Sequence, residues 1–274
     1  MKTKIIAVLI ALLALTSVFA QGSGKQQPKT KVAGAYTIEV GGSTSVTPLM
    51  ELLATEYAKV KPNIKVNING TGSGDGINNT GALYQIGMSS RELTPAEQGK
   101  GLKETIIAID GIAVIVNKSN TVDNLTLEQI RNIYTGAITN WSQVGGNNAP
   151  IAVVSREEGS GTRGAFEEIA RFQGLLLAKA NQLTSTGAIL ANIAQNPDAI
   201  GYISLGSLND SIKAVSVNGV AATSANVVKG SYKIARPFIV LTGKNVHAES
   251  SAFIKWMLSS EGQKVVSKSW IPVK

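Results

Sequence analysis

The chain contains no cysteine and a single histidine among its 274 residues. Without cysteine it cannot form disulfides, cysteine-ligated zinc sites, iron–sulfur clusters or a thiol nucleophile. One histidine also argues against a Ser-His-Asp triad and against a histidine-based metal site. The chemistry that remains relies on Ser, Thr, Arg, Asp, Glu and backbone amides, a set suited to anion binding. We therefore expect no metal site and no cofactor.

Aromatic residues are also scarce, at 5% of the chain, although the formal net charge is +8. A basic excess is often a sign of nucleic-acid binding. Here no run of basic residues is present and few aromatic side chains are available to stack on bases. Attraction of small anions fits this charge better than nucleic acid does.

The N-terminus has the pattern of a secretory signal peptide. Lys2 and Lys4 precede an apolar run from Ile5 to Leu15, and Val18-Phe19-Ala20 forms a small-x-small exit. The run is shorter than the roughly 20 residues that span a bilayer, so we expect cleavage after Ala20. No cysteine follows, which excludes lipidation. Residues 21–35 predict a flexible leader, and the mature protein is expected to be periplasmic or secreted, without a transmembrane segment.

Strand, loop and helix patterns alternate from Tyr36 onward. Residues 36–40 and 64–68 alternate as strands, and 106–116 form a long apolar run broken by Asp110-Gly111. The remaining predicted strands are 150–154, 200–204 and 238–242. One predicted helix starts near Pro48, others cover 77–83, 163–172 and 251–266, and a further one follows Ser185-Thr186-Gly187 and runs to Gln195. Thr126 and Gln129 predict a capping box for a further helix, which Gly136 ends. This alternation favours an α/β class with mainly parallel sheets.

Three Gly/Ser/Thr loops precede helices: Gly42–Ser45, Gly70–Gly76 and Glu158–Thr162. The first turn of a helix leaves backbone N–H groups unpaired, and these donors with the helix dipole bind anions. In an open α/β sheet such loops gather at the carboxyl ends of the strands. Any one loop taken alone is an ordinary helix cap, but three with several hydroxyls each indicate an anion site.

Arg156 is the residue most suited to carry the positive charge of such a site. It leaves a predicted strand and enters the third loop. Its planar guanidinium matches two oxygens of a phosphate or carboxylate. The alternative is a surface arginine paired to Glu157 or Glu158, and for Arg163 we favour that pairing.

Four segments of the chain resemble one family. They are Gly42-Ser43-Thr44-Ser45-Val46-Thr47-Pro48, Gly70-Thr71-Gly72-Ser73-Gly74, Gly87-Met88-Ser89-Ser90-Arg91-Glu92-Leu93 and Ser155-Arg156-Glu157-Glu158-Gly159-Ser160-Gly161-Thr162-Arg163. In this order they resemble the phosphate-binding proteins of bacterial and archaeal ABC-type phosphate importers. The resemblance runs from about Tyr36 to the C-terminus.

The resemblance implies a two-lobed, type II periplasmic-binding-protein fold that closes over one dehydrated phosphate and delivers it to an ABC transporter permease. It implies residues 36–114 and 237–274 as lobe 1 and 115–236 as lobe 2, with the hinge near 114–116 and 237–239. The expected protein is a monomer and not an enzyme. The implied ligands are Thr44, Ser45, Ser73, Ser90, Arg156, Ser160, Gly161 and Thr162, with Glu158 orienting Arg156.

One position departs from the family pattern. Well-known members carry an aspartate, which accepts the proton of HPO₄²⁻, where this chain has Ser90. Asp110, in an apolar run, is the candidate replacement and is included in the expected phosphate site, although a turn role bonded to its own backbone is an equal alternative. Asp75 is a second candidate. Two rival functions stay open: binding of another oxyanion such as sulfate or molybdate, and an exported phosphatase.

Overall fold

The structure, a computed structural model, describes residues 35–273 of the chain. The predicted signal peptide and all but the last residue of the predicted leader lie outside the described residues. The strands are β1 (Tyr36–Gly42), β2 (Ile64–Gly70), β3 (Ile86–Ser89), β4 (Lys103–Asn117), β5 (Asn124–Leu125), β6 (Ala152–Arg156), β7 (Asn181–Leu183), β8 (Ala199–Ser204), β9 (Ile212–Ala214), β10 (Ser216–Val217) and β11 (Ala235–Thr242). The helices are α1 (Thr47–Val60), α2 (Ser73–Asn79), α3 (Pro95–Gln98), α4 (Leu127–Thr135), α5 (Gly161–Ile169), α6 (Thr186–Gln195), α7 (Ser224–Val228), α8 (Ala248–Met257) and α9 (Ser260–Val266).

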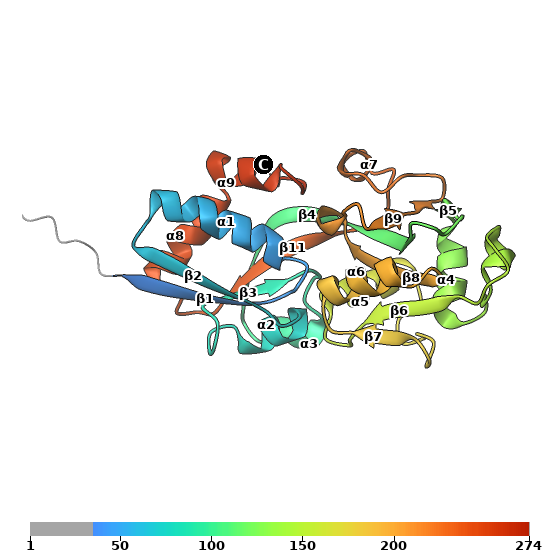
Figure 1. Cartoon of the computed structure of the whole chain (residues 1–274). Helices are drawn as coiled ribbons and strands as arrows, with labels where there is room; N and C mark the ends of the chain where they lie inside the picture. Colours follow the sequence, from blue (N-terminus) through green and yellow to red (C-terminus); the bar gives the residue numbers. More distant parts are fainter. Residues whose placement is uncertain (1–34, 274) are drawn as a thin grey trace, which may run out of the picture. The chain divides into compact units, whose positions relative to one another are not determined.

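Most strands belong to one mixed sheet, in the order β2-β1-β3-β11-β4-β8-β6-β7, with β9 also paired to β4. β1 is parallel to β2 and β3, and β11 is antiparallel to β3 and β4. β4 joins the two ends of the sheet: residues 103–111 pair with β11, and residues 112–116 pair with β8 (Figure 1). The predicted α/β class is confirmed.

The first core lies around β1, β3 and β11 and is covered by α1, α8 and α9. Pro48 stands in the first turn of α1, where its missing N–H costs nothing. Leu49, Leu53 and Tyr57 recur at four-residue spacing, so they share one helix face. All three are buried, which confirms the predicted apolar stripe.

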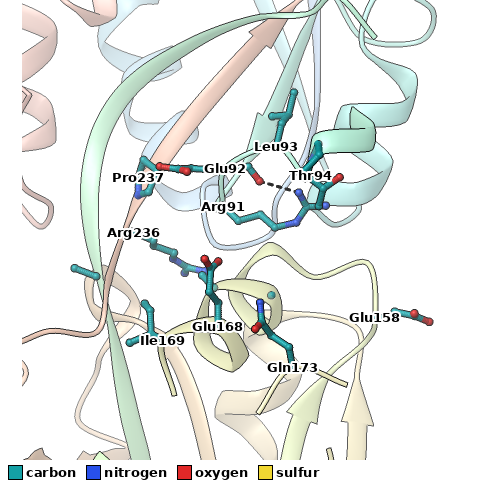
Figure 2. Close-up of a pocket in the computed structure, with 14 residues that line it drawn as sticks. Arg91, Glu92, Leu93, Thr94, Glu158, Glu168, Ile169, Gln173, Arg236 and Pro237 are labelled. Atoms are coloured by element: carbon teal, nitrogen blue, oxygen red, sulfur yellow. Dashed lines mark hydrogen bonds between the residues drawn. The ribbon is translucent and has the colours of Figure 1, made fainter. Parts of the chain in front are cut away.

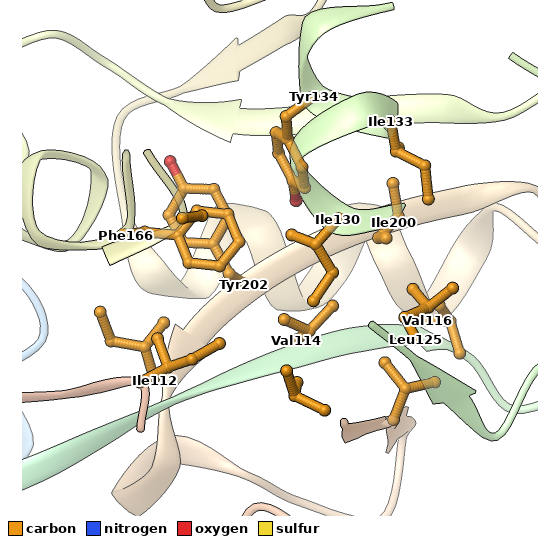
Figure 3. Close-up of a cluster of buried hydrophobic side chains, with 14 of the residues drawn as sticks. Ile112, Val114, Val116, Leu125, Ile130, Ile133, Tyr134, Phe166, Ile200 and Tyr202 are labelled. Carbon is orange, nitrogen blue, oxygen red and sulfur yellow. The ribbon is translucent and has the colours of Figure 1, made fainter. Parts of the chain in front are cut away.

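The second core lies between the second half of β4, β6 and β8 on one side and α4 and α5 on the other (Figure 3). Phe166 of α5 stacks on Tyr202 of β8, with ring centroids 4.2 Å apart, and Tyr134 of α4 packs against both. The predicted capping box and the left-handed Gly136 do bound α4. These aromatic contacts fix α5 against the sheet and so fix where its N-terminus lies.

Several predicted elements have different bounds: the helices expected over 163–172 and 77–83 are α5 (Gly161–Ile169) and α2 (Ser73–Asn79). Two of the differences have a clear local cause. The segment 251–266, expected as one helix, is two, because the Ser259 side chain accepts a hydrogen bond from the Gly262 N–H and starts α9. The loop expected over 70–76 is already helical from Ser73, because Gly72 turns the chain with a φ of 100°. Asp75 in the first turn of α2 suits the helix dipole.

Candidate functional site

Seven hydroxyl side chains from distant parts of the chain meet at one place, and we call them the hydroxyl cluster. Its members are Ser43, Thr44, Ser45, Ser73, Ser90, Thr162 and Thr186. Ser45 Oγ lies 2.7 Å from Thr162 Oγ1 and 3.2 Å from Thr186 Oγ1. All members except Thr44 are buried. Since buried hydroxyls need partners, this is a concentrated, water-excluded set of donors and acceptors.

Ser90 lies at the centre of one half of the hydroxyl cluster. Ser43 Oγ donates to Ser90 Oγ at 2.9 Å, and Ser73 Oγ lies 3.4 Å from the same atom. The Ser90 backbone N–H also donates to Ser73 Oγ at 3.1 Å. Loops after β1 and β3 and the start of α2 therefore converge, as the sheet topology requires for the carboxyl ends of parallel strands.

The N-terminus of α5 faces this half of the cluster without a side chain in between. A Cβ on Gly161 would lie 2.3 Å from Ser73 Oγ and 2.7 Å from Ser90 Oγ, so only glycine allows this approach. Ser160 caps the helix by accepting from the Arg163 N–H. The N–H groups of Gly161 and Thr162, in the first turn, are of the kind that lack intrahelical acceptors. These donors and the helix dipole are directed at the hydroxyl cluster.

Arg156 ends β6 and is almost fully buried. Its Nε and Nη2 each lie 2.8 Å from a carboxylate oxygen of Glu157, and they also donate to the backbone oxygens of Leu183 and Thr184. Glu157, rather than the predicted Glu158, thus holds the guanidinium in place, and Glu158 is exposed. The remaining nitrogen of the guanidinium, Nη1 of Arg156, has no hydrogen bond within the described residues.

Both aspartates considered as proton acceptors have other partners. Asp75 accepts from Thr71, Asn79 and Tyr84, all close to it in sequence. Asp110 accepts from Ser204 Oγ at 2.9 Å.

Arg236 is the second partner of Asp110. Its Nη2 lies 3.2 Å from Asp110 Oδ2. Burial raises the pKa of Asp110 to about 6. Asp110 is not in the turn that was its alternative, since β4 runs through it and Gly111 without a break.

Arg163 is paired to a carboxylate, but to Glu167 rather than to the expected Glu157 or Glu158. Its Nε lies 2.6 Å from Glu167 Oε1, and its Nη1 donates to the Arg156 carbonyl oxygen. Arg163 therefore supports the end of β6 from the first turn of α5.

A cavity of about 600 Å³, whose lining is drawn in Figure 2, begins at Arg91, the residue after Ser90, and contains no member of the hydroxyl cluster in its walls. Its walls are Arg91 to Pro95, residues 164, 165, 168 and 169 of α5, residues 235–237, Glu158 and Gln173. Arg91 is held there by a bidentate pair with Glu97, whose pKa this hydrogen-bonded arginine lowers to about 2. Because none of the cluster hydroxyls lines this cavity, we take the cluster as the candidate site and the cavity as a neighbouring space.

Within residues 35–273, no helix is long and apolar enough to cross a membrane. The same residues contain no group of three or more His, Cys, Asp or Glu side chains arranged to hold a metal ion.

Most of the residues expected at the site are brought together. Thr44, Ser45, Ser73, Ser90 and Thr162 are in the hydroxyl cluster, and Ser160 and Gly161 border it. Asp110 has no hydrogen bond to the cluster within the described residues, and Glu158 has none to Arg156.

Sequence reasoning missed Ser43 and Thr186. The signal for Thr186 was present, because Ser185-Thr186-Gly187 also precedes a helix, α6. Ser43 adjoins Thr44 in the first loop, and only its bond to Ser90 reveals its place.

The mixed sheet and the hydroxyl cluster at its strand ends together have the form of a receptor for a small anion. The sequence profile of the PBP superfamily domain matches residues 23–261. The phosphate-binding protein PstS of Borreliella burgdorferi is 31% identical over 283 aligned residues, which cover 97% of both chains.

Solved structures agree with this match. A putative phosphate ABC transporter substrate-binding protein from Clostridium perfringens, solved with bound phosphate, is 47% identical with a TM-score of 0.85, covering 87% of this chain and all of that one. An ABC-type phosphate transport receptor from Vibrio cholerae is 37% identical with a TM-score of 0.71, over 86% and 99% of the two chains. This chain therefore belongs to the PBP superfamily, in the family of PstS phosphate-binding proteins, as its four motifs predict.

Proposed function

We propose that this protein captures inorganic phosphate in the hydroxyl cluster and delivers it to an ABC transporter permease. The observation that carries the proposal is the meeting of seven hydroxyls with the N-terminus of α5. The buried Arg156 ends β6, just before the loop that leads into the same helix. The phosphate bound in the Clostridium perfringens relative supports the identity of the anion. Thr44, Ser45, Ser73, Ser90, Ser160 and Thr162 supply hydroxyls, Gly161 supplies an amide, and Arg156 supplies the charge. To these expected ligands we add Ser43 and Thr186.

We further propose that two lobes close over the anion. Each core is built from its own part of the chain, and β4 and β11 pass between them. The change of partner along β4 falls between Gly111 and Ile112, and we propose the lobe boundary there, about three residues before the predicted 114. The Ser45–Thr162 contact then joins the two lobes, and phosphate would take over these hydroxyls on binding.

Discrimination between phosphate and sulfate in this site is expected to depend on Ser90. A carboxylate would reject sulfate because like charges repel in a desolvated site. A serine hydroxyl both donates and accepts, so it accepts the proton of HPO₄²⁻ with a weaker penalty against sulfate. Asp110 and Asp75 are less suited to that role because Arg236, Ser204, Thr71 and Tyr84 occupy their oxygens.

The protein acts in this proposal as an exported binding protein and not as an enzyme. The relatives are named for phosphate binding and transport. Equilibrium dialysis of radiolabelled phosphate against the purified protein tests it, with sulfate and molybdate as competitors. Displacement by either competitor at equal concentration would transfer the proposal to that anion. Hydrolysis of a generic phosphate ester that survives a chelator would restore the phosphatase alternative.

A further inference from the structure

Asp110 and Arg236 form a buried ion pair that phosphate capture by the hydroxyl cluster does not use. They lie opposite each other on β4 and β11, with side chains 1% and 2% exposed. Nη2 and Nε of Arg236 lie 3.2 Å and 3.4 Å from Asp110 Oδ2. Nη1 of Arg236 is buried and has no hydrogen-bond partner within the described residues. An unpaired buried donor is costly, so this arrangement calls for an account.

The pair lies on the sheet face that α5 covers. Side chains alternate along β4, so Asp110 shares its face with Ile112, a member of the second core. Arg236 lines the cavity together with residues 164, 165, 168 and 169 of α5 (Figure 2). Arg91, which directly follows Ser90 of the hydroxyl cluster, lines the same cavity, so one space connects the surroundings of Arg236 with those of the cluster.

Two side chains of β8, two residues apart, bond the ion pair and the backbone of Arg156 separately. Ser204 of β8 donates to Asp110. Two residues earlier on the same face of that strand, the Tyr202 hydroxyl accepts from the Arg156 backbone N–H at 3.2 Å. Burial lowers the pKa of Arg236, and the positive charge of Arg156 acts in the same direction. Both guanidinium groups are almost fully buried, so solvent screens the charge of each only weakly.

The two arginines are neutralised to different degrees. Arg156 is held by Glu157 through two contacts of 2.8 Å. Arg236 is held by Asp110 at distances longer than the 2.7–2.9 Å usual for charge-assisted pairs. Asp110 is thus the looser counter-ion, and it gains a proton near pH 6 because burial raises its pKa.

Other charged or titratable groups face the pair or the cavity beside it: Arg156, Tyr202, Arg91, Glu92, Glu158 and Glu168. Glu92, Glu158 and Glu168 are exposed, so solvent screens them.

We propose that Arg236 is a second buried cation of the anion site and that Asp110 sets how strongly its charge acts on the bound anion. This inference rests on the proposed function. Removing the counter-charge at Asp110 strengthens anion binding, whereas removing the cation at Arg236 weakens it. A pair with a purely structural role gives the same sign for both changes, because each change leaves one buried partner alone.

The test is isothermal titration of phosphate into the purified protein at pH 8, where Asp110 is ionised. Asp110→Asn is expected to tighten the dissociation constant roughly tenfold, and Arg236→Met to weaken it roughly tenfold, the scale of an interaction between unit charges that are not in contact at an effective permittivity near 20. Arg236→Lys keeps the charge and most of the affinity. Arg131→Met removes a charge from an exposed position of α4 and controls for the change in net charge. It is expected to leave the phosphate dissociation constant unchanged.

The double variant Asp110→Asn/Arg236→Met leaves no buried charge unpaired, so it serves if Arg236→Met folds poorly. It is expected to bind more weakly than Asp110→Asn alone. Wild type and Asp110→Asn are then compared at pH 5, where both meet the same ionic form of phosphate. Because Asp110 is mostly protonated at that pH, the two affinities should converge. Asp110→Asn that binds more weakly than wild type, or variants that all bind alike, would overturn the inference alone. A wild-type protein that ignores phosphate would overturn the proposed function and this inference with it.

Discussion

Gly161 offers the sharpest test of where the anion binds. A Cβ at this position would lie 2.3 Å from Ser73 Oγ, 2.7 Å from Ser90 Oγ and 2.9 Å from Ser73 Cβ. Rotation of the two hydroxyls cannot relieve the contact with the Ser73 Cβ, so Gly161→Ala must move α5 away from the hydroxyl cluster. One hydrogen bond from the α5 N-terminus to a charged ligand would be lost, at about 1.5–3 kcal/mol. The phosphate dissociation constant should rise roughly ten- to hundredfold.

Gly161→Ala should also lower the stability of the free protein by about 1–3 kcal/mol, because the added Cβ displaces α5, which Phe166 packs against Tyr134 and Tyr202. Gly159→Ala is the matched control two residues earlier, where a Cβ would meet nothing within 4 Å. Isothermal titration measures the affinity and thermal unfolding without phosphate measures the stability of both variants. If Gly161→Ala bound phosphate as well as Gly159→Ala, the anion would not lie between α5 and the serines.

Three further predictions concern charge. Arg156→Met should lower phosphate affinity by about 2–5 kcal/mol, the scale for truncating a buried hydrogen-bonded charge; near-normal titration would remove Arg156 from the site. Asp110 holds its proton more tightly folded than unfolded, so its contribution to the unfolding free energy should fall by about 3 kcal/mol as pH rises from about 4 to about 6. Denaturant unfolding should show this fall in wild type and not in Asp110→Asn; identical pH profiles would contradict it. Ser90→Asp should weaken sulfate binding more than phosphate binding in competition titrations, and an equal loss of both would argue against a proton test at this position.

Local patterns in the sequence predicted much of the fold. The stripe of Leu49, Leu53 and Tyr57 and the cap at Thr126 determine α1 and α4 by short-range periodicity and hydrogen bonding. The single helix expected over 251–266 was wrong because its apolar spacing continues across Ser259, and only the serine cap separates α8 from α9. Such a break needs one hydrogen bond and leaves no mark on periodicity.

The candidate site was predictable where a motif carried it and not where contacts cross the chain. Ser45 and Thr162 stand in motif loops, although 117 residues separate them. The pairing of Asp110 with Arg236 depends on the register of β4 against β11, which no local pattern contains. An acidic residue in an apolar run predicts that the side chain has a partner, but it does not identify that partner.

A crystal structure of the protein grown with phosphate would test the central claim most directly. The account predicts phosphate oxygens within hydrogen-bond distance of Ser45, Ser73, Ser90 and Thr162, and of Nη1 of Arg156. Phosphate held instead in the neighbouring cavity, with the cluster hydroxyls still bonded to one another as they are here, would contradict it.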